Sequence, residues 1–150
     1  TRSWGGTGVQ TCALPISDVE EPVGAIVSQN EGIVENCSFE GNIKFSGSFS
    51  GRKYVGGIAG NIISGKVQNC YNAANIDISG VDCGLICGGI IGSTSMSNSV
   101  TNCYNTGTIT VALDSSSTSG TALAGGIAAM GDVTNCYNTG LITATGINSS

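Results

Sequence analysis

The chain has 150 residues, a net charge of −5 and only five Lys or Arg residues. This charge argues against nucleic acid as a partner, because a phosphate-binding surface needs clustered Lys and Arg. The adjacent Arg52 and Lys53 are expected to lie in a solvated loop. No run of about 20 apolar residues is present, so no membrane span is predicted. The 24 Gly, with small and β-branched apolar residues, suit strands and tight turns.

The N-terminal 17 residues differ in character from the rest of the chain. The string from Thr7 to Ser17 resembles the translation of a DNA sequencing adapter read through into the frame. Residues 1–17 are therefore interpreted as an adapter-derived or disordered leader, with an ordinary leader or strand as the alternative. The biological chain is expected to begin near Asp18 and to be a fragment of a longer repeat protein.

An internal repeat with a period of 33 residues dominates the remaining sequence. Each copy contains the dipeptide Asn-Cys, with a valine three residues before the cysteine and an isoleucine six residues after it. The dipeptides and their isoleucines are Asn36-Cys37 with Ile43, Asn69-Cys70 with Ile76, Asn102-Cys103 with Ile109, and Asn135-Cys136 with Ile142. Self-similarity at a fixed period of this length is typical of repeat architectures.

A glycine-rich block precedes each Asn-Cys dipeptide. The four blocks are Val23–Ile26, Val55–Ile58, Cys87–Ile90 and Ala124–Ile127. The isoleucine of the block lies 11, 12, 13 and 9 residues before the cysteine, so the connection varies in length. The Asn-Cys segment itself keeps a constant length, which predicts strands joined by variable loops.

Each repeat predicts three short strands, which in the second copy are Val55–Gly60, Lys66–Tyr71 and Asn75–Ser79. Short strands between Gly, Asn and Ser turns are typical of a β-solenoid. We therefore predict an all-β fold, a parallel β-helix or β-solenoid of about four coils with three strands per coil. An antiparallel sandwich fits the strand lengths but does not explain the constant register. The expected repeats cover residues 22–49, 50–82, 83–115 and 120–146.

Stacking identical residues in register places them in columns. Val67 and Cys70 are three residues apart, so both can face inward only if the chain bends between them. Asn69 tolerates left-handed backbone, and the four Asn-Cys asparagines are expected at a corner where their amides bond along the axis. The four cysteines and the four isoleucines are predicted to form two interior columns, with reduced thiols favoured over disulfides between stacked cysteines.

In the second copy, Val55-Gly-Gly-Ile-Ala-Gly60 is followed by Gly65-Lys-Val-Gln-Asn-Cys-Tyr-Asn72. With these segments the chain resembles the GLUG repeat family, and the resemblance covers about residues 22 to 146. The first copy has Asn36-Cys37-Ser38 where the others have Asn-Cys-Tyr, and Ala25 replaces its second glycine. The resemblance implies a large exported bacterial protein, either adhesin-like or the non-catalytic region of an IgA-specific metallopeptidase.

No catalytic or metal site is predicted, and no cofactor is expected. The sequence has no histidine, and Cys83 and Cys87 have no second closely spaced pair to complete a zinc site. A β-helix that cleaves polysaccharides would need clustered carboxylates, but the aspartates recur at no common repeat position; they are Asp77, Asp82, Asp114 and Asp132. Most general-base schemes also lack their histidine.

Two functions remain open at this point. The first is a non-catalytic structural or adhesive module of an exported bacterial cell-surface protein. The second is an accessory, non-catalytic segment of a secreted hydrolase such as an IgA-specific metallopeptidase. Both place the chain outside the cell or on its surface, next to further repeats of a longer chain. A host or cell-surface protein or glycan is the expected partner.

Overall fold

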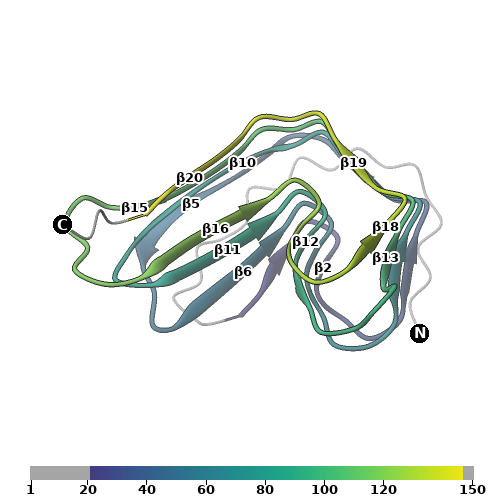
Figure 1. Ribbon diagram of the computed structural model, residues 1–150, viewed down its shortest axis with the longest axis horizontal. Helices are drawn as coiled ribbons and strands as arrows, with labels where there is room; N and C mark the ends of the chain where they lie inside the picture. The colour runs from purple at the N-terminus through teal and green to yellow at the C-terminus, as the bar shows by residue number, and fades with distance from the viewer. Residues whose placement is uncertain (1–20, 147–150) are drawn as a thin grey trace.

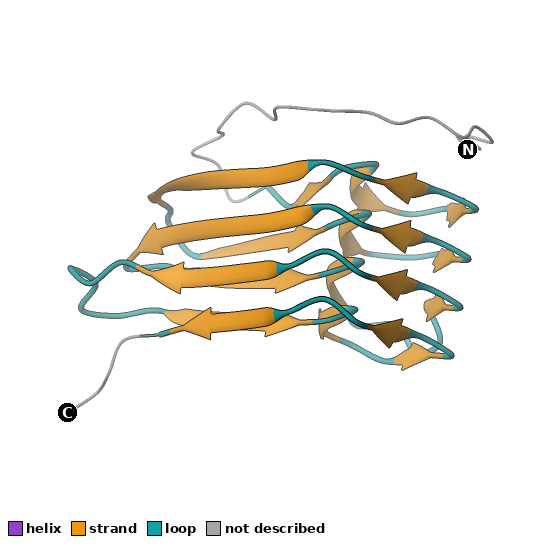
Figure 2. Cartoon of the chain, turned by 90° about the horizontal axis from the view of Figure 1, so that it is seen from above, coloured by secondary structure: helices purple, strands orange, loops and turns teal. Residues whose placement is uncertain are grey.

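The computed structural model describes residues 21–146, and every regular element in that range is a β-strand. Figure 1 looks along the stack of coils, and Figure 2 shows the coils lying one beside another. All strand pairings are parallel and in register, for example Ile43 with Ile76 and Ile76 with Ile109. The predicted parallel β-solenoid of four coils is therefore confirmed. Within residues 21–146 there is no helix that is long and apolar enough to cross a membrane.

Each coil contributes one strand to each of five parallel sheets. The first sheet contains β1 (Val23–Gly24), β6 (Arg52–Gly56), β11 (Gly84–Gly88) and β16 (Thr121–Gly125). The second contains β2 (Val27–Asn30), β7 (Ala59–Ile62), β12 (Ile91–Thr94) and β17 (Ala128–Met130). The third contains β3 (Ile33–Glu35), β8 (Lys66–Gln68), β13 (Val100–Thr101) and β18 (Val133–Thr134).

The two remaining sheets complete the coil. The fourth contains β4 (Ser38–Phe39), β9 (Tyr71–Asn72), β14 (Tyr104–Asn105) and β19 (Tyr137–Asn138). The fifth contains β5 (Asn42–Ser48), β10 (Asn75–Val81), β15 (Ile109–Leu113) and β20 (Ile142–Thr145). Coil 1 is therefore β1 to β5, coil 2 is β6 to β10, coil 3 is β11 to β15 and coil 4 is β16 to β20.

The prediction of three strands per coil is wrong, because two of the expected strands are each divided by a bend. Between β8 and β9, Asn69 has left-handed backbone with φ of 52°, which ends one strand and redirects the next. Between β6 and β7 the chain turns at Gly56, where an added Cβ would collide with the Ala59 carbonyl oxygen. A glycine is required at that bend because its backbone approaches so closely.

The core is a set of apolar columns running through the stack. Val67, Cys70 and Ile76 of coil 2 are 0%, 0% and 1% exposed. Cys87 is fully buried in β11 and pairs in register with Val55 and Ala124, so it is an apolar core residue. Because a single coil has no apolar layer beneath it, this burial depends on its neighbours.

The expectation that Arg52 and Lys53 occupy a solvated loop is wrong. Both lie in β6, where alternate side chains point to opposite sides of the sheet. Arg52 is exposed, whereas Lys53 faces inward and is only 2% exposed. The Lys53 ammonium lies 5.6 Å from the centre of the Phe49 ring, close enough for a cation–π contact. The position of Lys53 in β6 therefore buries this side chain although it is charged.

Candidate functional site

The predicted cysteines and isoleucines occupy two columns inside the solenoid. The isoleucine column is paired directly across β5, β10, β15 and β20. The cysteine column lies at the bend between the third and fourth sheets, and its members in coils 1 to 3 are buried. Cys136 and Ile142, in coil 4, are half-buried. The predicted leader, residues 1–17, lies outside the described residues.

The thiols of the cysteine column bond to the backbone of the bend. Each Sγ–H donates to the carbonyl two residues earlier at 3.2 Å, as Cys70 does to Gln68 and Cys103 to Thr101. A hydrogen bond with Cys70 raises the pKa of the Cys103 thiol, and burial raises it further. Burial alone raises the pKa of Cys87. The raised pKa values keep the Cys103 and Cys87 thiols protonated at neutral pH, so these two cysteines act as packing groups rather than nucleophiles.

The four asparagines of the Asn-Cys dipeptides lie at the outer corner. All four have left-handed backbone, with φ between 52° and 54°, and all are exposed; they are Asn36, Asn69, Asn102 and Asn135. Asn102 donates through Nδ2 to Asn69 Oδ1 at 3.2 Å, across an exposed inter-coil gap. All four asparagines therefore form the bend of the backbone, because the left-handed conformation is the property that they share.

A second set of asparagines, which sequence reasoning missed, lies inside. Asn72 and Asn105 are fully buried two residues after their cysteines, and Asn138 is the equivalent in coil 4. Asn72 Nδ2 donates to Asn105 Oδ1, and Asn105 Nδ2 donates to Asn138 Oδ1, both at 2.7 Å. This chain of amide bonds, the asparagine ladder, joins coils 2, 3 and 4. Among the described residues no buried side-chain nitrogen or oxygen lacks a partner.

The paired glycines make room for this ladder. A Cβ on Gly89 would lie 2.6 Å from Asn105 Cγ, and one on Gly126 would lie 2.6 Å from Asn138 Cγ. Both distances are shorter than van der Waals contact, so the second glycine of each pair keeps space for the amide. The signal was present in the sequence as Gly-Gly and Tyr-Asn recurring together in copies 2 to 4.

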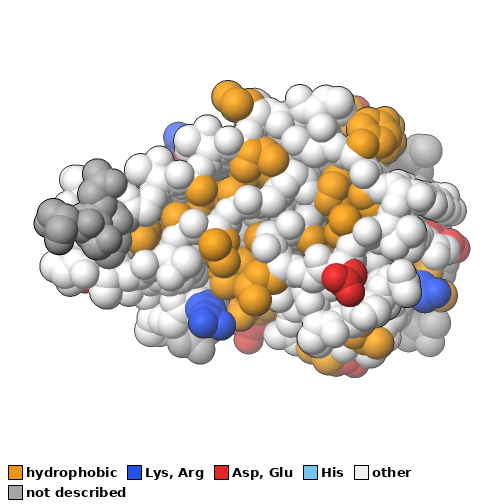
Figure 3. Space-filling view, viewed as in Figure 1, with side chains coloured by type: hydrophobic (Ala, Val, Ile, Leu, Met, Phe, Trp, Pro, Cys, Tyr) orange, Lys and Arg blue, Asp and Glu red, His pale blue; other side chains and the backbone are white. Residues whose placement is uncertain are grey.

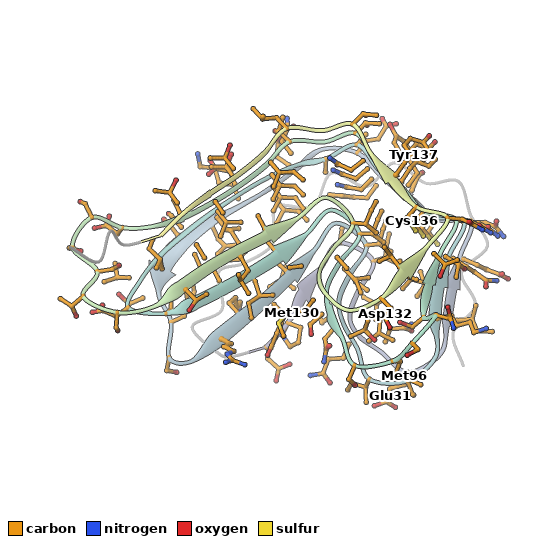
Figure 4. The ribbon with its side chains drawn as sticks, in the orientation of Figure 1. Glu31, Met96, Met130, Asp132, Cys136 and Tyr137 are labelled. Atoms are coloured by element: carbon orange, nitrogen blue, oxygen red, sulfur yellow. The ribbon has the colours of Figure 1, made fainter. Side chains whose placement is uncertain are left out.

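The outer wall carries a tyrosine stack over the fourth sheet. Tyr71 and Tyr104 have ring centres 4.4 Å apart, and Tyr104 and Tyr137 have centres 5.0 Å apart. Figure 4 places Tyr137 on the outer side of the coil, where it is 56% exposed. The rings cover one another's faces and present their edges and hydroxyls to solvent. Ser38 holds the equivalent position in coil 1.

A shallow groove crosses the outer face of the fifth sheet. Its residues follow those of the tyrosine stack by a few positions in the sequence. It has a volume of about 310 Å³ and runs between the side-chain rows of β5, β10 and β15. One side has an ion pair of 2.9 Å between Lys44 and Asp77. On the other, Thr108 donates through Oγ1 to Asn75 Oδ1 at 2.7 Å. Polar side chains that form hydrogen bonds therefore line the groove together with Ile43 and Ile76.

Loops of variable length project from two edges of the coil. One edge has residues 31–32, 63–65, 95–99 and 131–132, which include Glu31, Met96 and Asp132 in Figure 4. The other edge has residues 49–51, 82–83 and 114–120. Asp82 orders the longest loop by accepting from the amides of Thr118 at 2.6 Å and Ser119 at 2.9 Å. These bonds lower the pKa of Asp82.

The aspartates considered for catalysis lie in different places. Asp77 is on the fifth sheet, Asp82 and Asp114 flank the loops at one edge, and Asp132 is at the other edge. Within residues 21–146 no group of three or more His, Cys, Asp or Glu is arranged to hold a metal ion. Comparisons with protein-family models, curated proteins and solved structures found no match.

Proposed function

We propose that this chain is a non-catalytic structural or adhesive repeat module of the GLUG type, from an exported bacterial cell-surface protein. The observation that carries this proposal is the division between a repeated interior and a varied exterior. Inside, the same residue types occupy one register position in successive coils, as Ile43, Ile76 and Ile109 do. Outside, loops such as 95–99 and 114–120 differ from coil to coil.

This division suits a display scaffold. Each coil adds about 4.8 Å of length, because neighbouring strands keep that spacing. Loop changes do not disturb the columns, so the outer surface is free to vary. The tyrosine stack and the polar groove supply aromatic edges, hydroxyls and amides, which are groups that bind glycans or protein surfaces through hydrogen bonds.

Adhesion is tested with beads coated with the whole chain, applied to glycan arrays and immobilised host extracellular proteins. Binding should fall at least tenfold when Tyr71, Tyr104 and Tyr137 are all changed to Ser. Tyr54→Ser is the matched control, since Tyr54 lies half-buried on the outer face of the first sheet. Absence of binding to every surface tested would count against adhesion.

The genomic context provides a second test. Sequencing the uninterrupted gene should reveal further repeats and a cell-wall anchor. A zinc-protease sequence of the type His-Glu-x-x-His in the same gene would instead make this chain the accessory segment of a secreted hydrolase.

A further inference from the structure

The groove on the fifth sheet crosses the strands, so it runs along the axis of the solenoid. Its two walls are rows of outward side chains that share register positions in successive coils. One wall is Asn42, Asn75 and Thr108, and the other is Lys44, Asp77 and Thr110. The walls are two residues apart on each strand, which separates them by about 6.6 Å at the backbone. A ligand in this groove is therefore a single chain that lies along the stack of coils.

Each wall is ordered by bonds from one coil to the next. Lys44 Nζ lies 2.9 Å from Asp77 Oδ2 in one wall. In the other wall, the hydroxyl and the backbone amide of Thr108 both donate to Asn75 Oδ1, at 2.7 Å and 3.1 Å. These bonds hold the side chains in position before a ligand arrives, which reduces the entropic cost of binding.

The same bonds leave hydrogen-bonding groups for a ligand. Within residues 21–146, Asn75 bonds through its side-chain oxygen, so the two N–H groups of Nδ2 remain as donors. Asp77 bonds to Lys44 through Oδ2, so Oδ1 remains as an acceptor. One wall thus offers donors and the other an acceptor. A hydroxyl group both donates and accepts, so two neighbouring hydroxyls on one ligand satisfy both walls.

The charges of the groove favour a neutral ligand. Lys44 and Asp77 neutralise each other, and a charged ligand would have to compete with this ion pair. The net charge of −5 on the whole chain also repels an anionic polymer. On the side of the molecule seen in Figure 3, the Lys, Arg, Asp and Glu side chains stand singly and form no patch of one sign.

The groove lacks the features that bind a protein segment. Its apolar lining residues, Ile43 and Ile76, are only 3% and 1% exposed, so they offer no pocket for an apolar anchor. An extended peptide usually pairs with the open edge of a sheet, whereas this groove crosses the face of one. The lining therefore favours a polyhydroxylated chain over a peptide.

We infer that the groove binds a neutral, extended oligosaccharide along the solenoid axis, with Asn75 donating to one sugar hydroxyl and Asp77 accepting from a neighbouring one. The inference rests on the proposed adhesive function and names its ligand. A sugar residue in an extended chain is similar in length to the coil spacing of about 4.8 Å, so successive sugars meet successive coils. The groove volume of about 310 Å³ suits a short segment, since small ligand sites begin at about 300 Å³.

The test is an NMR titration of the whole chain with three straight, neutral trisaccharides: cellotriose, chitotriose and mannotriose. At least one should shift the amide signals of Asn75, Asp77 and Thr108, including the Asn75 side-chain amide. Asn75→Ala and Asp77→Ala should each weaken binding about fivefold, as expected for the loss of one hydrogen bond. Asp132→Ala is the matched control and should bind as the original chain does, because Asp132 is an exposed aspartate at a loop edge.

The shifts in the original chain locate the site without any variant, and amide dispersion shows whether each variant is folded. No shift with any of the three sugars, or shifts confined to other sheets, would overturn the inference. Tighter binding of the anionic trigalacturonate would overturn the neutral ligand. Adhesion of coated beads to host proteins without sugar binding would overturn this inference and leave the adhesive function intact. Sugar binding at the groove without bead adhesion would support the inference and count against adhesion.

Discussion

The cysteine column and the asparagine ladder run side by side through the same interior, two residues apart in coils 2 to 4, yet they stabilise it in different ways. Cys70 and Cys103 are buried and donate to carbonyls of their own coil at 3.2 Å, with longer contacts of 3.7 and 3.8 Å to Val34 O and Val67 O of the preceding coil. Asn72 and Asn105 are equally buried but bond from one coil to the next at 2.7 Å. The cysteines thus fill space and connect the coils only through long sulfur contacts, whereas the asparagines connect them through short amide bonds.

The difference shows that a repeated residue in the sequence predicts which side chains stack, but not whether they stabilise the stack by packing or by hydrogen bonds. A thiol is a weak donor that behaves as a small apolar group in a core. A buried amide requires partners for both its oxygen and its nitrogen, and an identical amide one coil away satisfies both. Changes in the asparagine ladder should therefore cost more than changes in the cysteine column.

The largest effect is expected for Asn105→Leu. The change removes the acceptor of one Asn72 N–H and the donor to Asn138 Oδ1, while Asn72 Nδ2 keeps its bond to Ala74 O. The free energy of unfolding should therefore fall by about 3–5 kcal/mol. Urea denaturation measures the loss. Thr106→Val, at the exposed neighbouring position, is the control and should cost less than about 0.5 kcal/mol. If Asn105→Leu lost less unfolding free energy than Cys70→Ser, the asparagine ladder would not be the more important of the two columns.

Gly89→Ala should have the next largest effect, because it fills the space beside the ladder. The new Cβ would collide with the Gly126 carbonyl and lie 2.6 Å from Asn105 Cγ. Overpacking of this kind costs about 2–3 kcal/mol. Gly32→Ala is the matched control, since a Cβ there has no atom within 4 Å. Thermal melts that place the two variants within a degree of each other would contradict this role for the second glycine.

Cys70→Ser is expected to be milder. The hydroxyl keeps a donor within reach of Gln68 O, the acceptor of the present thiol at 3.2 Å, but it buries a more polar group. A loss of about 1–2 kcal/mol in the free energy of unfolding follows. Cys136→Ser should cost less, since Cys136 in coil 4 is only half-buried. Equal losses at both positions would show that burial by the next coil does not matter to this column.

The sequence allowed the stacking and one bend to be predicted, because both depend on spacing. The 33-residue period determines which residues pair, and the three-residue separation of Val67 and Cys70 requires a bend at Asn69. The burial of Asn72 was missed because polarity suggests exposure, and its partner Asn105 is distant in sequence. Lys53 was missed for a similar reason, since its contact with Phe49 depends on the register of β6.

The smallest effect on stability is expected for Asp82, which orders the loop of residues 114–120. This effect should depend on pH. The Thr118 and Ser119 amides hold the pKa of Asp82 below its ordinary value of 3.8. A carboxyl whose pKa is lower in the folded state stabilises the fold above the unfolded pKa, and this contribution is lost as pH falls through the folded pKa. Asp82→Asn should therefore lower the melting temperature slightly at pH 7, by less than Cys70→Ser.

The difference between Asp82→Asn and the original chain should shrink as the pH falls below 3.8 and through the lower pKa of the folded carboxyl. Thr118→Ala is the matched control. It removes one hydroxyl, which lies 3.2 Å from Asp82 Oδ1, and retains both amide donors. The pH dependence should therefore persist in that variant, because two backbone amides remain to stabilise the ionised carboxylate. A difference between Asp82→Asn and the original chain that stayed constant from pH 7 to pH 3 would show that the loop is ordered by contacts other than this carboxylate.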